Sequence, residues 1–187
     1  MVDPNGEDAI WLQDQNAVWG MGHTGLLIQD KGGTWYHFYW GRTGTGKLGK
    51  SGATGEVKSL GRFRYSNRTQ LNNYLNKNGI YSGKYESLIY FRGDFSASLQ
   101  YAKQLKRGYN LLWDNCMQLS VDVLSKGSFA QNNKQYKSFL KKISFNPVPN
   151  CAYISLRNFH SIVVRYNSAP MYLRAFYINP TKAVLMC

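Results

Sequence analysis

Two short runs of apolar, aromatic and β-branched residues stand close together near the start of the chain. Residues 23–28 form the first run and residues 34–40 the second, with Asp30-Lys31-Gly32-Gly33 between them. Runs of this length and composition around a glycine-containing turn are typical of a β-hairpin. The pattern therefore predicts two antiparallel strands joined by a short loop.

The rest of the chain alternates between strand-like runs and runs with a helical period. Strands are predicted over residues 57–65, 86–92, 151–156, 161–166 and 171–177. Helices are predicted over residues 69–76, 96–106, 116–126 and 133–143, the second of them capped by Asp94 or Ser96. Together these elements indicate an α+β domain in which an antiparallel sheet has helices packed against it.

The length of the chain, 187 residues, fits a single domain. Residues 1–20 hold a turn-forming start and then scattered apolar residues, which predicts an N-terminal extension. Residues 20–126 are expected to form the core of the domain. Residues 127–187 are expected to add a helix and the C-terminal strands.

A glycine-rich, basic segment over residues 41–56 is predicted to be a loop. It contains Gly44-x4-Gly49-Lys50-Ser51, which matches the phosphate-binding P-loop pattern. That motif requires a helix directly after the loop, whose first amides hold the phosphates. The residues that follow, Gly52-Ala53-Thr54-Gly55, do not favour a helix, so we interpret the match as coincidental.

The charge balance is strongly basic, with 23 lysines and arginines against 10 acidic residues and a formal net charge of +13. Such a surface favours an acidic partner, which leaves nucleic acid, an anionic membrane face and an acidic protein open. A basic surface that serves only solubility is a further alternative. No apolar run approaches the roughly 20 residues of a membrane span, so stable membrane insertion is not expected. The N-terminus lacks the basic start and apolar stretch of a signal peptide.

Three cysteines, Cys116, Cys151 and Cys187, are too few and too widely spaced for a disulfide framework. Cys116 follows Asp114 and Asn115, two residues that often cap helices, so it is predicted to lie in the first turn of a helix. The free amides and the dipole at such a position favour a nucleophilic thiolate, and the same amides suit an oxyanion. A packed, inert thiol is the alternative. The roles of Cys151 and Cys187 are left open.

A thiolate needs a base, and the sequence contains three histidines: His23, His37 and His160. A three-residue hairpin loop over residues 30–32, with Gly32 at positive φ, would pair residue 25 with His37 and place His23 and His37 on one face. A two-residue loop would place them on opposite faces. The first register predicts a relay in which His23 takes the thiol proton and His37 orients His23. His160 has no nucleophile nearby and is assigned to packing.

Neither a metal nor a cofactor is expected. The histidines and cysteines lack the spacing of metal ligands, and few acidic residues stand near them.

The arrangement of His23-Thr24-Gly25, His37 and Tyr109-x5-Asn115-Cys116 resembles the circularly permuted papain-like thiol enzymes, and within them the lecithin:retinol acyltransferase-like group. The resemblance covers residues 20–126 and implies a permuted papain-like fold. It also implies that His23 is the base, His37 the orienting residue and Cys116 the nucleophile. Lipid-acting members of the group carry a hydrophobic membrane-seeking segment, which this sequence lacks. That difference favours hydrolysis of a peptide or another amide over acyl transfer.

A shorter stretch, Val2-Asp3-Pro4-Asn5-Gly6-Glu7, is similar to the segment that closes the core of Rhs-repeat polymorphic toxins ahead of a variable toxin domain. This resemblance implies a toxin or effector domain, secreted as the tip of a larger protein and acting inside a recipient cell. An immunity protein would then be a partner.

The leading hypothesis is a cysteine-dependent protease, amidase or deamidase. Acyl transfer or phospholipid deacylation by the same residues is a close alternative. A basic, metal-free ribonuclease that uses His23 and His37 as its acid–base pair is a second alternative, in which Cys116 has no role. A binding module without catalysis is the third.

Overall fold

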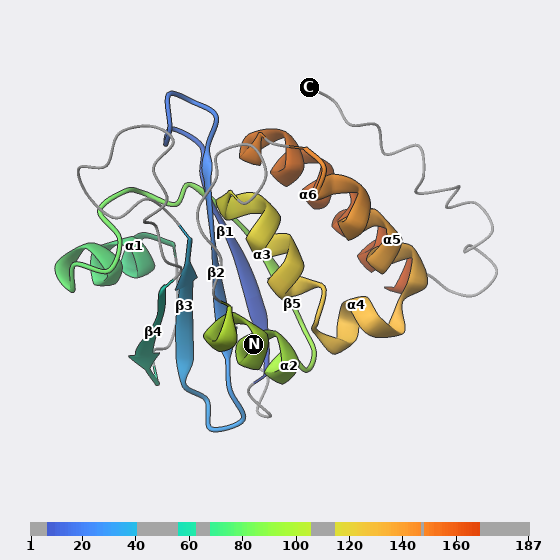
Figure 1. Cartoon of the computed structure of the whole chain (residues 1–187), viewed down its shortest axis with the longest axis horizontal. Helices are drawn as coiled ribbons and strands as arrows, with labels where there is room; N and C mark the ends of the chain where they lie inside the picture. Colours follow the sequence, from blue (N-terminus) through green and yellow to red (C-terminus); the bar gives the residue numbers. More distant parts are fainter. Residues whose placement is uncertain (1–6, 41–55, 63–67, 106–114, 147, 169–187) are drawn as a thin grey trace.

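The computed structural model describes residues 7–40, 56–62, 68–105, 115–146 and 148–168. Its centre is one antiparallel sheet with the strand order β4-β3-β2-β1-β5 (Figure 1). The strands are β1 (Ala9–Asp14), β2 (His23–Gln29), β3 (Trp35–Tyr39), β4 (Glu56–Gly61) and β5 (Ser87–Phe91). The helices are α1 (Arg68–Lys77), α2 (Ser96–Gln104), α3 (Cys116–Leu124), α4 (Ser128–Asn132), α5 (Lys134–Ile143) and α6 (Pro149–Ser168). The predicted α+β class is therefore confirmed.

The two faces of the sheet bury separate hydrophobic clusters because successive strand residues point to opposite sides. On one face, Trp11, Leu26 and Phe38 pack with residues of α2, α3, α5 and α6. On the other face, Leu12 and Leu27 pack with α1 and with the segment before β5. The strands of this sheet are thus covered on both sides.

The strand β1 lies between β2 and β5. The sequence pattern predicts no strand within residues 1–20, so this central strand was missed. All six of its residues are buried, and it pairs in antiparallel fashion with both neighbours. Its six residues do not alternate between apolar and polar because both faces are covered, so the period-two signal is missing.

The predicted strands over residues 151–156 and 161–166 are wrong, because both ranges belong to the helix α6. The β-branched and aromatic residues in this region suggested strands. The buried residues Ala152, Leu156 and Phe159 nevertheless recur at helical spacing, and Pro149 occupies the first helical position, where proline is favoured. The predicted strand over residues 171–177 and the loop over residues 41–55 lie outside the described residues.

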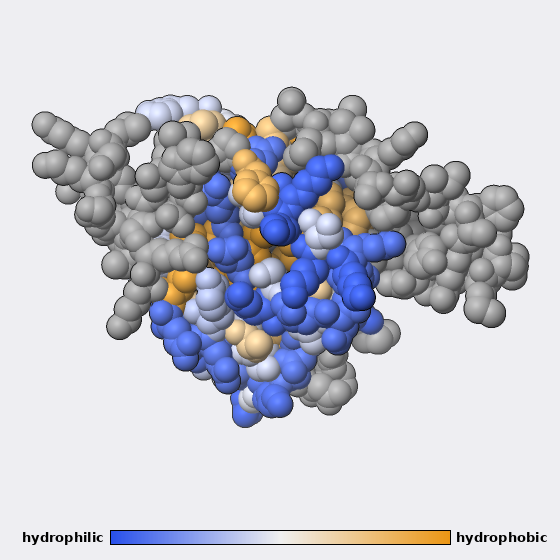
Figure 2. Space-filling model, turned by 45° about the vertical axis from the view of Figure 1, so that its right-hand side comes forward, coloured by the Kyte–Doolittle hydropathy of each residue, from blue (hydrophilic) through white to orange (hydrophobic). Residues whose placement is uncertain are grey.

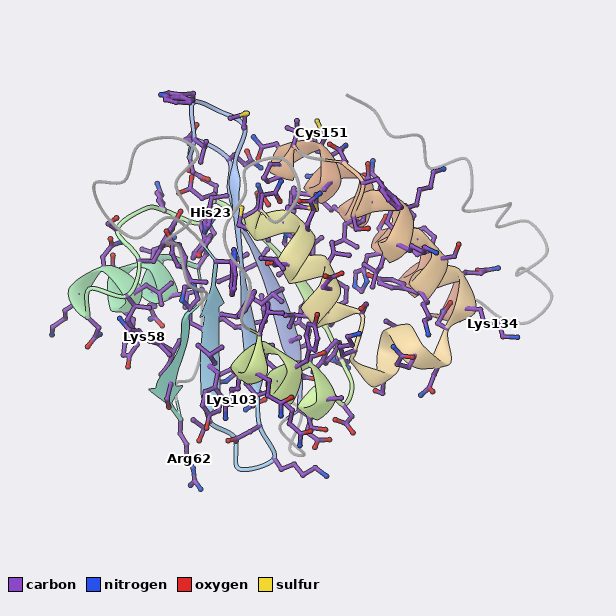
Figure 3. All side chains as sticks on the ribbon, viewed as in Figure 1. His23, Lys58, Arg62, Lys103, Lys134 and Cys151 are labelled. Carbon is purple, nitrogen blue, oxygen red and sulfur yellow. The ribbon has the colours of Figure 1, made fainter. Side chains whose placement is uncertain are left out.

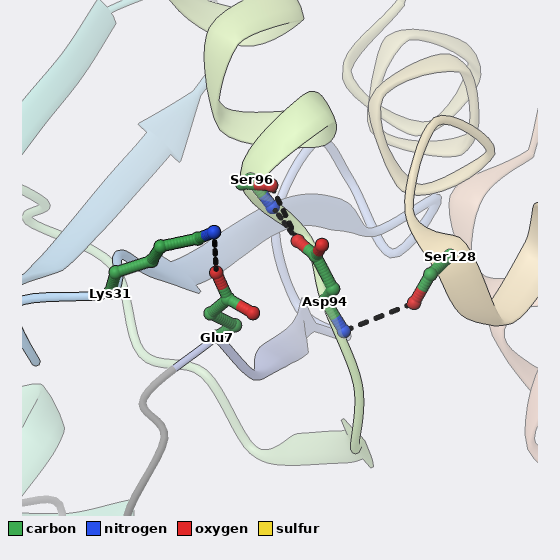
Figure 4. Close-up of polar contacts among 5 residues, drawn as sticks. All are labelled: Glu7, Lys31, Asp94, Ser96 and Ser128. Carbon is green, nitrogen blue, oxygen red and sulfur yellow. Dashed lines mark hydrogen bonds and ion pairs between the residues drawn. The ribbon is translucent and has the colours of Figure 1, made fainter.

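Phe95 is the cap residue of α2 and makes no side-chain capping bond, so the predicted cap at Asp94 or Ser96 is wrong. Asp94, directly before it, contacts the first residue of the helix (Figure 4). Its Oδ1 accepts hydrogen bonds from the Ser96 hydroxyl and, at 2.8 Å, from the Ser96 amide, and these two bonds lower the pKa of the Asp94 carboxyl. The Asp94 amide donates to Ser128 Oγ at 3.1 Å, which ties α2 to α4. Nearby, Lys31 and Glu7 form an ion pair at 3.5 Å.

Hydrophilic residues cover most of the described surface in the view of Figure 2. Among the described residues, the exposed large hydrophobic side chains are Val18, Trp19 and Phe145. No helix in the described ranges has the length and hydropathy needed to cross a membrane.

The helical assignment of α6 is tested by a pair of residues that a strand would place on one face. Phe159 is buried and stacks on Phe139 at 4.0 Å, whereas Arg157 is exposed. We expect Phe159→Ala to lower the free energy of unfolding by about 3–5 kcal/mol, and Arg157→Ala by less than about 1 kcal/mol. Urea denaturation measures both values. Equal losses from the two variants would contradict the helix.

Candidate active site

The helix α3 begins at Cys116, and Asn115 is its cap, as predicted. Asn115 Oδ1 accepts the amides of Met117 and Gln118, each at 3.0 Å, and Gln118 Oε1 accepts the Asn115 amide at 3.2 Å. This reciprocal capping box fixes the first turn of the helix. Asp114 lies outside the described residues.

The Cys116 sulfur lies against the beginning of β2. The backbone amides of Thr24, Met117 and Cys116 itself lie close enough to the sulfur to favour its charged form. Thr24 directly follows His23, which is the first residue of β2. Figure 3 shows His23 at the end of the sheet nearest the start of α3. The fold therefore places the predicted nucleophile beside the residue that follows the predicted base.

The predicted hairpin is confirmed, but its register differs by two residues from the expected one. Gly25 pairs with Tyr39, and His37 pairs with Leu27. The loop begins one residue later than expected, because Gly33 takes positive φ (77°) in place of Gly32. An even shift keeps His23 and His37 on one face.

Tyr39 occupies the position next to His23 that the sequence assigned to His37. Its ring centroid lies 4.8 Å from that of His23 and 6.2 Å from that of His37. His37 Nε2 forms a hydrogen bond of 3.1 Å with the Tyr85 hydroxyl. No hydrogen bond joins the side chains of His23 and His37. His37 therefore contacts Tyr85, and its predicted role of orienting His23 has no direct contact to support it.

Gly25 makes room for the bond between His37 and Tyr85. A Cβ atom at position 25 would lie 2.5 Å from the Tyr85 hydroxyl oxygen and 3.2 Å from His37 Nε2. Packing therefore explains why a glycine stands in the His-Thr-Gly motif: a larger residue would collide with Tyr85 and His37.

His23 is almost fully buried, and its Nε2 atom has no hydrogen-bond partner. The Tyr81 ring stacks on the imidazole at 5.5 Å with an interplanar angle of 22°. Burial lowers the pKa of His23 to about 4, and the charge of Asp14 opposes this shift. Burial also lowers the pKa of His37 to about 3, helped by the nearby His23 and Lys58. Both histidines are therefore neutral near pH 7.

The thiol of Cys116 is also neutral at rest. Burial raises its pKa to about 11, and the three neighbouring amides oppose this shift without cancelling it. In the free protein, desolvation of the charge therefore outweighs the preference of the helix start for a thiolate. A thiolate of Cys116 would raise the pKa of Tyr39 and of Tyr85, which places the sulfur close to both phenols.

The loop over residues 15–22, directly before His23, is fixed by the first turn of α6. Asn150 Nδ2 donates to the carbonyl oxygens of Gln15 (3.0 Å) and Gly20 (2.8 Å). The backbone amide of Asn150 donates to the carbonyl oxygen of Met21 (3.0 Å). Within the loop, Val18 and Trp19 have positive φ, and Trp19 is 84% exposed.

The remaining candidate residues lie elsewhere. His160 packs against Phe91 at 4.7 Å between ring centroids, and its Nδ1 lies 3.3 Å from the Tyr136 hydroxyl, which agrees with the predicted packing role. Cys151 is disulfide-bonded, and Cys116 is the free cysteine of the described part of the chain.

Sequence reasoning missed Asp14, Tyr81 and Tyr85, which surround the two histidines. None of them belongs to a recognisable motif, and only the pairing of β1 with β2 and the fold of the segment before β5 place them there. The described residues contain no cluster of three side chains suited to holding a metal ion.

No protein-family model matches the chain, and neither a curated protein nor a solved structure matches it.

The buried histidines predict an acid-sensitive fold. Their pKa values, about 4 for His23 and about 3 for His37, lie below that of a histidine in the unfolded chain, about 6.5. The unfolded chain therefore binds more protons below pH 6.5, and the free energy of unfolding falls as the pH drops from about 6.5 to about 4. Each histidine contributes a slope of at most about 1.4 kcal/mol per pH unit. Urea denaturation across this range should show a shallower slope for His37→Gln than for wild type; equal slopes would contradict the assignment.

Gly25→Ala should disturb the same cluster because its Cβ would clash with Tyr85 and His37. We expect a loss of about 1–3 kcal/mol of stability and a changed ring environment of His37, measured by thermal melting and by NMR of labelled histidines. Gly32→Ala, in the exposed hairpin loop, is the matched control. A harmless Gly25→Ala would show that the cluster is more loosely packed than described.

Proposed function

We propose that the protein is a cysteine-dependent hydrolase with Cys116 as nucleophile and His23 as general base, in a permuted papain-like arrangement. One observation carries the proposal: the Cys116 sulfur lies at a capped helix start, close to the amide of the residue that follows His23. The buried Nε2 atom of His23 without a partner supports it, because a general base needs a free acceptor. The order of histidine before cysteine fits the permuted group.

In the reaction, His23 removes the thiol proton and the sulfur forms a bond to the substrate carbonyl carbon. The resulting oxyanion accepts a hydrogen bond from the Cys116 amide at the start of α3. The C–N bond then breaks, and the leaving amine or ammonia takes the proton from His23. Water attacks the thioester with His23 again as base, which releases the carboxylic acid and restores the thiol.

The neutral resting state suits this sequence of steps. A thiol with a pKa near 11 beside an imidazole with a pKa near 4 does not transfer its proton spontaneously. The proton moves together with the attack on the carbonyl, when the negative charge passes from sulfur to the oxyanion. The amides at the helix start then stabilise that charge.

The proposed substrates are peptides, proteins or other amides, cleaved or deamidated by a toxin or effector domain in a recipient cell. The similarity of Val2–Glu7 to the segment that closes Rhs cores supports this context, together with the net charge of +13, which suits an acidic partner. An immunity protein over the site belongs to the same proposal.

The ribonuclease alternative is less well supported by the geometry. It requires His23 and His37 to act as an acid–base pair on one phosphate, yet Tyr39 lies between their rings and Tyr85 occupies His37 Nε2. Acyl transfer uses the same Cys116 and His23, so only the product distinguishes it from hydrolysis.

The first experiment is acylation by p-nitrophenyl acetate, a small ester that reports nucleophile and base without knowledge of the substrate. We expect a burst of about one nitrophenolate per chain, an acetyl group on Cys116 by mass spectrometry, and no burst with Cys116→Ala. His23→Gln should lower the acylation rate by about 10²–10⁴-fold, the usual contribution of a general base. Circular dichroism shows whether each variant is folded.

Release of nitrophenolate at the same rate by wild type and His23→Gln, with acetyl groups on lysines and none on Cys116, would sink the proposal. Assays with fluorogenic peptide amides, phospholipid vesicles and RNA then separate the product classes. RNA cleavage that survives Cys116→Ser would identify the ribonuclease instead.

A further inference from the structure

The acidic residue Asp14 lies directly across from His23 in the sheet. The register of β1 and β2 pairs these two residues, so their side chains leave the same face at adjacent positions. Only 5% of Asp14 is exposed, and the same is true of His23. A carboxylate at this depth is unusual and calls for a compensating group.

Four donors hold the Asp14 carboxylate in one orientation. Oδ1 accepts the amides of Asn16 (3.1 Å) and Ala17 (3.0 Å). Oδ2 accepts the Tyr81 hydroxyl (2.7 Å) and the Lys84 amide (3.2 Å). None of these donors carries a positive charge, and within the described residues Asp14 forms no salt bridge. The carboxylate is thus fixed and hydrogen-bonded, but its charge is not neutralised.

Tyr81 connects the carboxylate to the imidazole. Its hydroxyl binds Asp14 while its ring stacks on His23, so one side chain holds both groups in place. The Tyr81 ring also stacks on Tyr85 at 4.4 Å, which fixes it from the other side.

The described titratable groups around His23 are Asp14, which pairs with it across the strands, and the rings of Tyr39 and Tyr81. One contact further out lie His37, Tyr85 and Cys116. Burial raises the pKa of each of the three tyrosines, so the phenols stay neutral, and His37 and the Cys116 thiol are neutral at rest. Among these described groups, Asp14 is therefore the charge that a protonated His23 would meet.

We propose that Asp14 is the positioning residue of the active site, and that it stabilises the imidazolium of His23 formed when the Cys116 proton is transferred. This inference rests on the proposed function and moves the orienting role from His37 on β3 to Asp14 on β1. His37 instead holds Tyr85 through its Nε2 atom. The imidazolium forms in a site shielded from water, where a fixed opposite charge has a large effect.

The test compares Asp14→Asn, which removes the charge and nearly keeps the shape, with Tyr81→Phe, which removes one hydrogen bond and keeps both the charge and the stacked ring. We expect Asp14→Asn to lower the p-nitrophenyl acetate acylation rate of Cys116 at least tenfold, Tyr81→Phe by less than about threefold, and Asp14→Glu to restore part of the loss. His37→Gln should cost less than Asp14→Asn. Thermal melting identifies any variant that fails to fold.

A second readout does not depend on activity. NMR of ¹³C,¹⁵N-histidine-labelled full-length protein follows the protonated fraction of His23 with pH, assigned with His23→Gln. At a pH near 4.5, Asp14→Asn should lower that fraction by about tenfold, as a pKa decrease of about one unit requires. Tyr81→Phe should change it far less.

An unchanged His23 titration in folded Asp14→Asn, or equal effects of Asp14→Asn and Tyr81→Phe in both readouts, would overturn the inference. A larger loss from His37→Gln than from Asp14→Asn would return the orienting role to His37. If Cys116 of the wild type is not acylated at all, the proposed function fails, and the titration still decides whether Asp14 acts on His23.

Discussion

The close approach of the Thr24 amide to the Cys116 sulfur joins two parts of the chain that are far apart in sequence, and the candidate active site depends on it. Each side of this contact is fixed independently. The capping box of Asn115 and Gln118 determines where α3 begins. The pairing of β2 with both β1 and β3 determines where Thr24 lies. Because neither side can move without breaking its own hydrogen bonds, the sulfur is held beside the residue that follows His23.

Burial is the second constraint, and it determines the electrostatics of the site. Both the thiol and the imidazoles are held in their neutral forms, since removal from water disfavours any charge. In the proposed mechanism such a site reacts only when a substrate brings a carbonyl that can take up negative charge. Among the described groups around His23, Asp14 is the one whose charge favours the imidazolium over the neutral ring.

The features that could be predicted from the sequence are those set by neighbouring residues. The hairpin follows from two β-rich runs around a glycine turn, and the start of α3 follows from Asn115 before an apolar helical pattern. The hairpin register depends on which of two adjacent glycines, Gly32 or Gly33, takes positive φ, and the sequence does not distinguish them. That choice put Tyr39 where His37 was expected.

Other features depend on tertiary packing and left no local signal. The strand β1 is covered on both faces and lacks alternation, so Asp14 was not recognised as a neighbour of His23. The helix α6 is rich in residues that favour strands, and only the spacing of its buried side chains indicates a helix. The first error came from a missing local signal, and the second from a local preference that the surrounding structure overrode.

The helix α6 also belongs to the site, although it lies beyond the part of the chain that resembles the permuted papain-like enzymes. Two bulky residues in the left-handed region, Val18 and Trp19, cost about 1–2 kcal/mol each, and a loop held only by its own backbone would relax away from that conformation. Asn150 prevents this with its hydrogen bonds to Gln15, Gly20 and Met21. The same side chain accepts Gln13 Nε2 at 2.8 Å, so one residue of α6 holds both ends of the loop that leads into His23. The position of His23, the proposed base, is thus set from the C-terminal part of the chain as well as from the sheet.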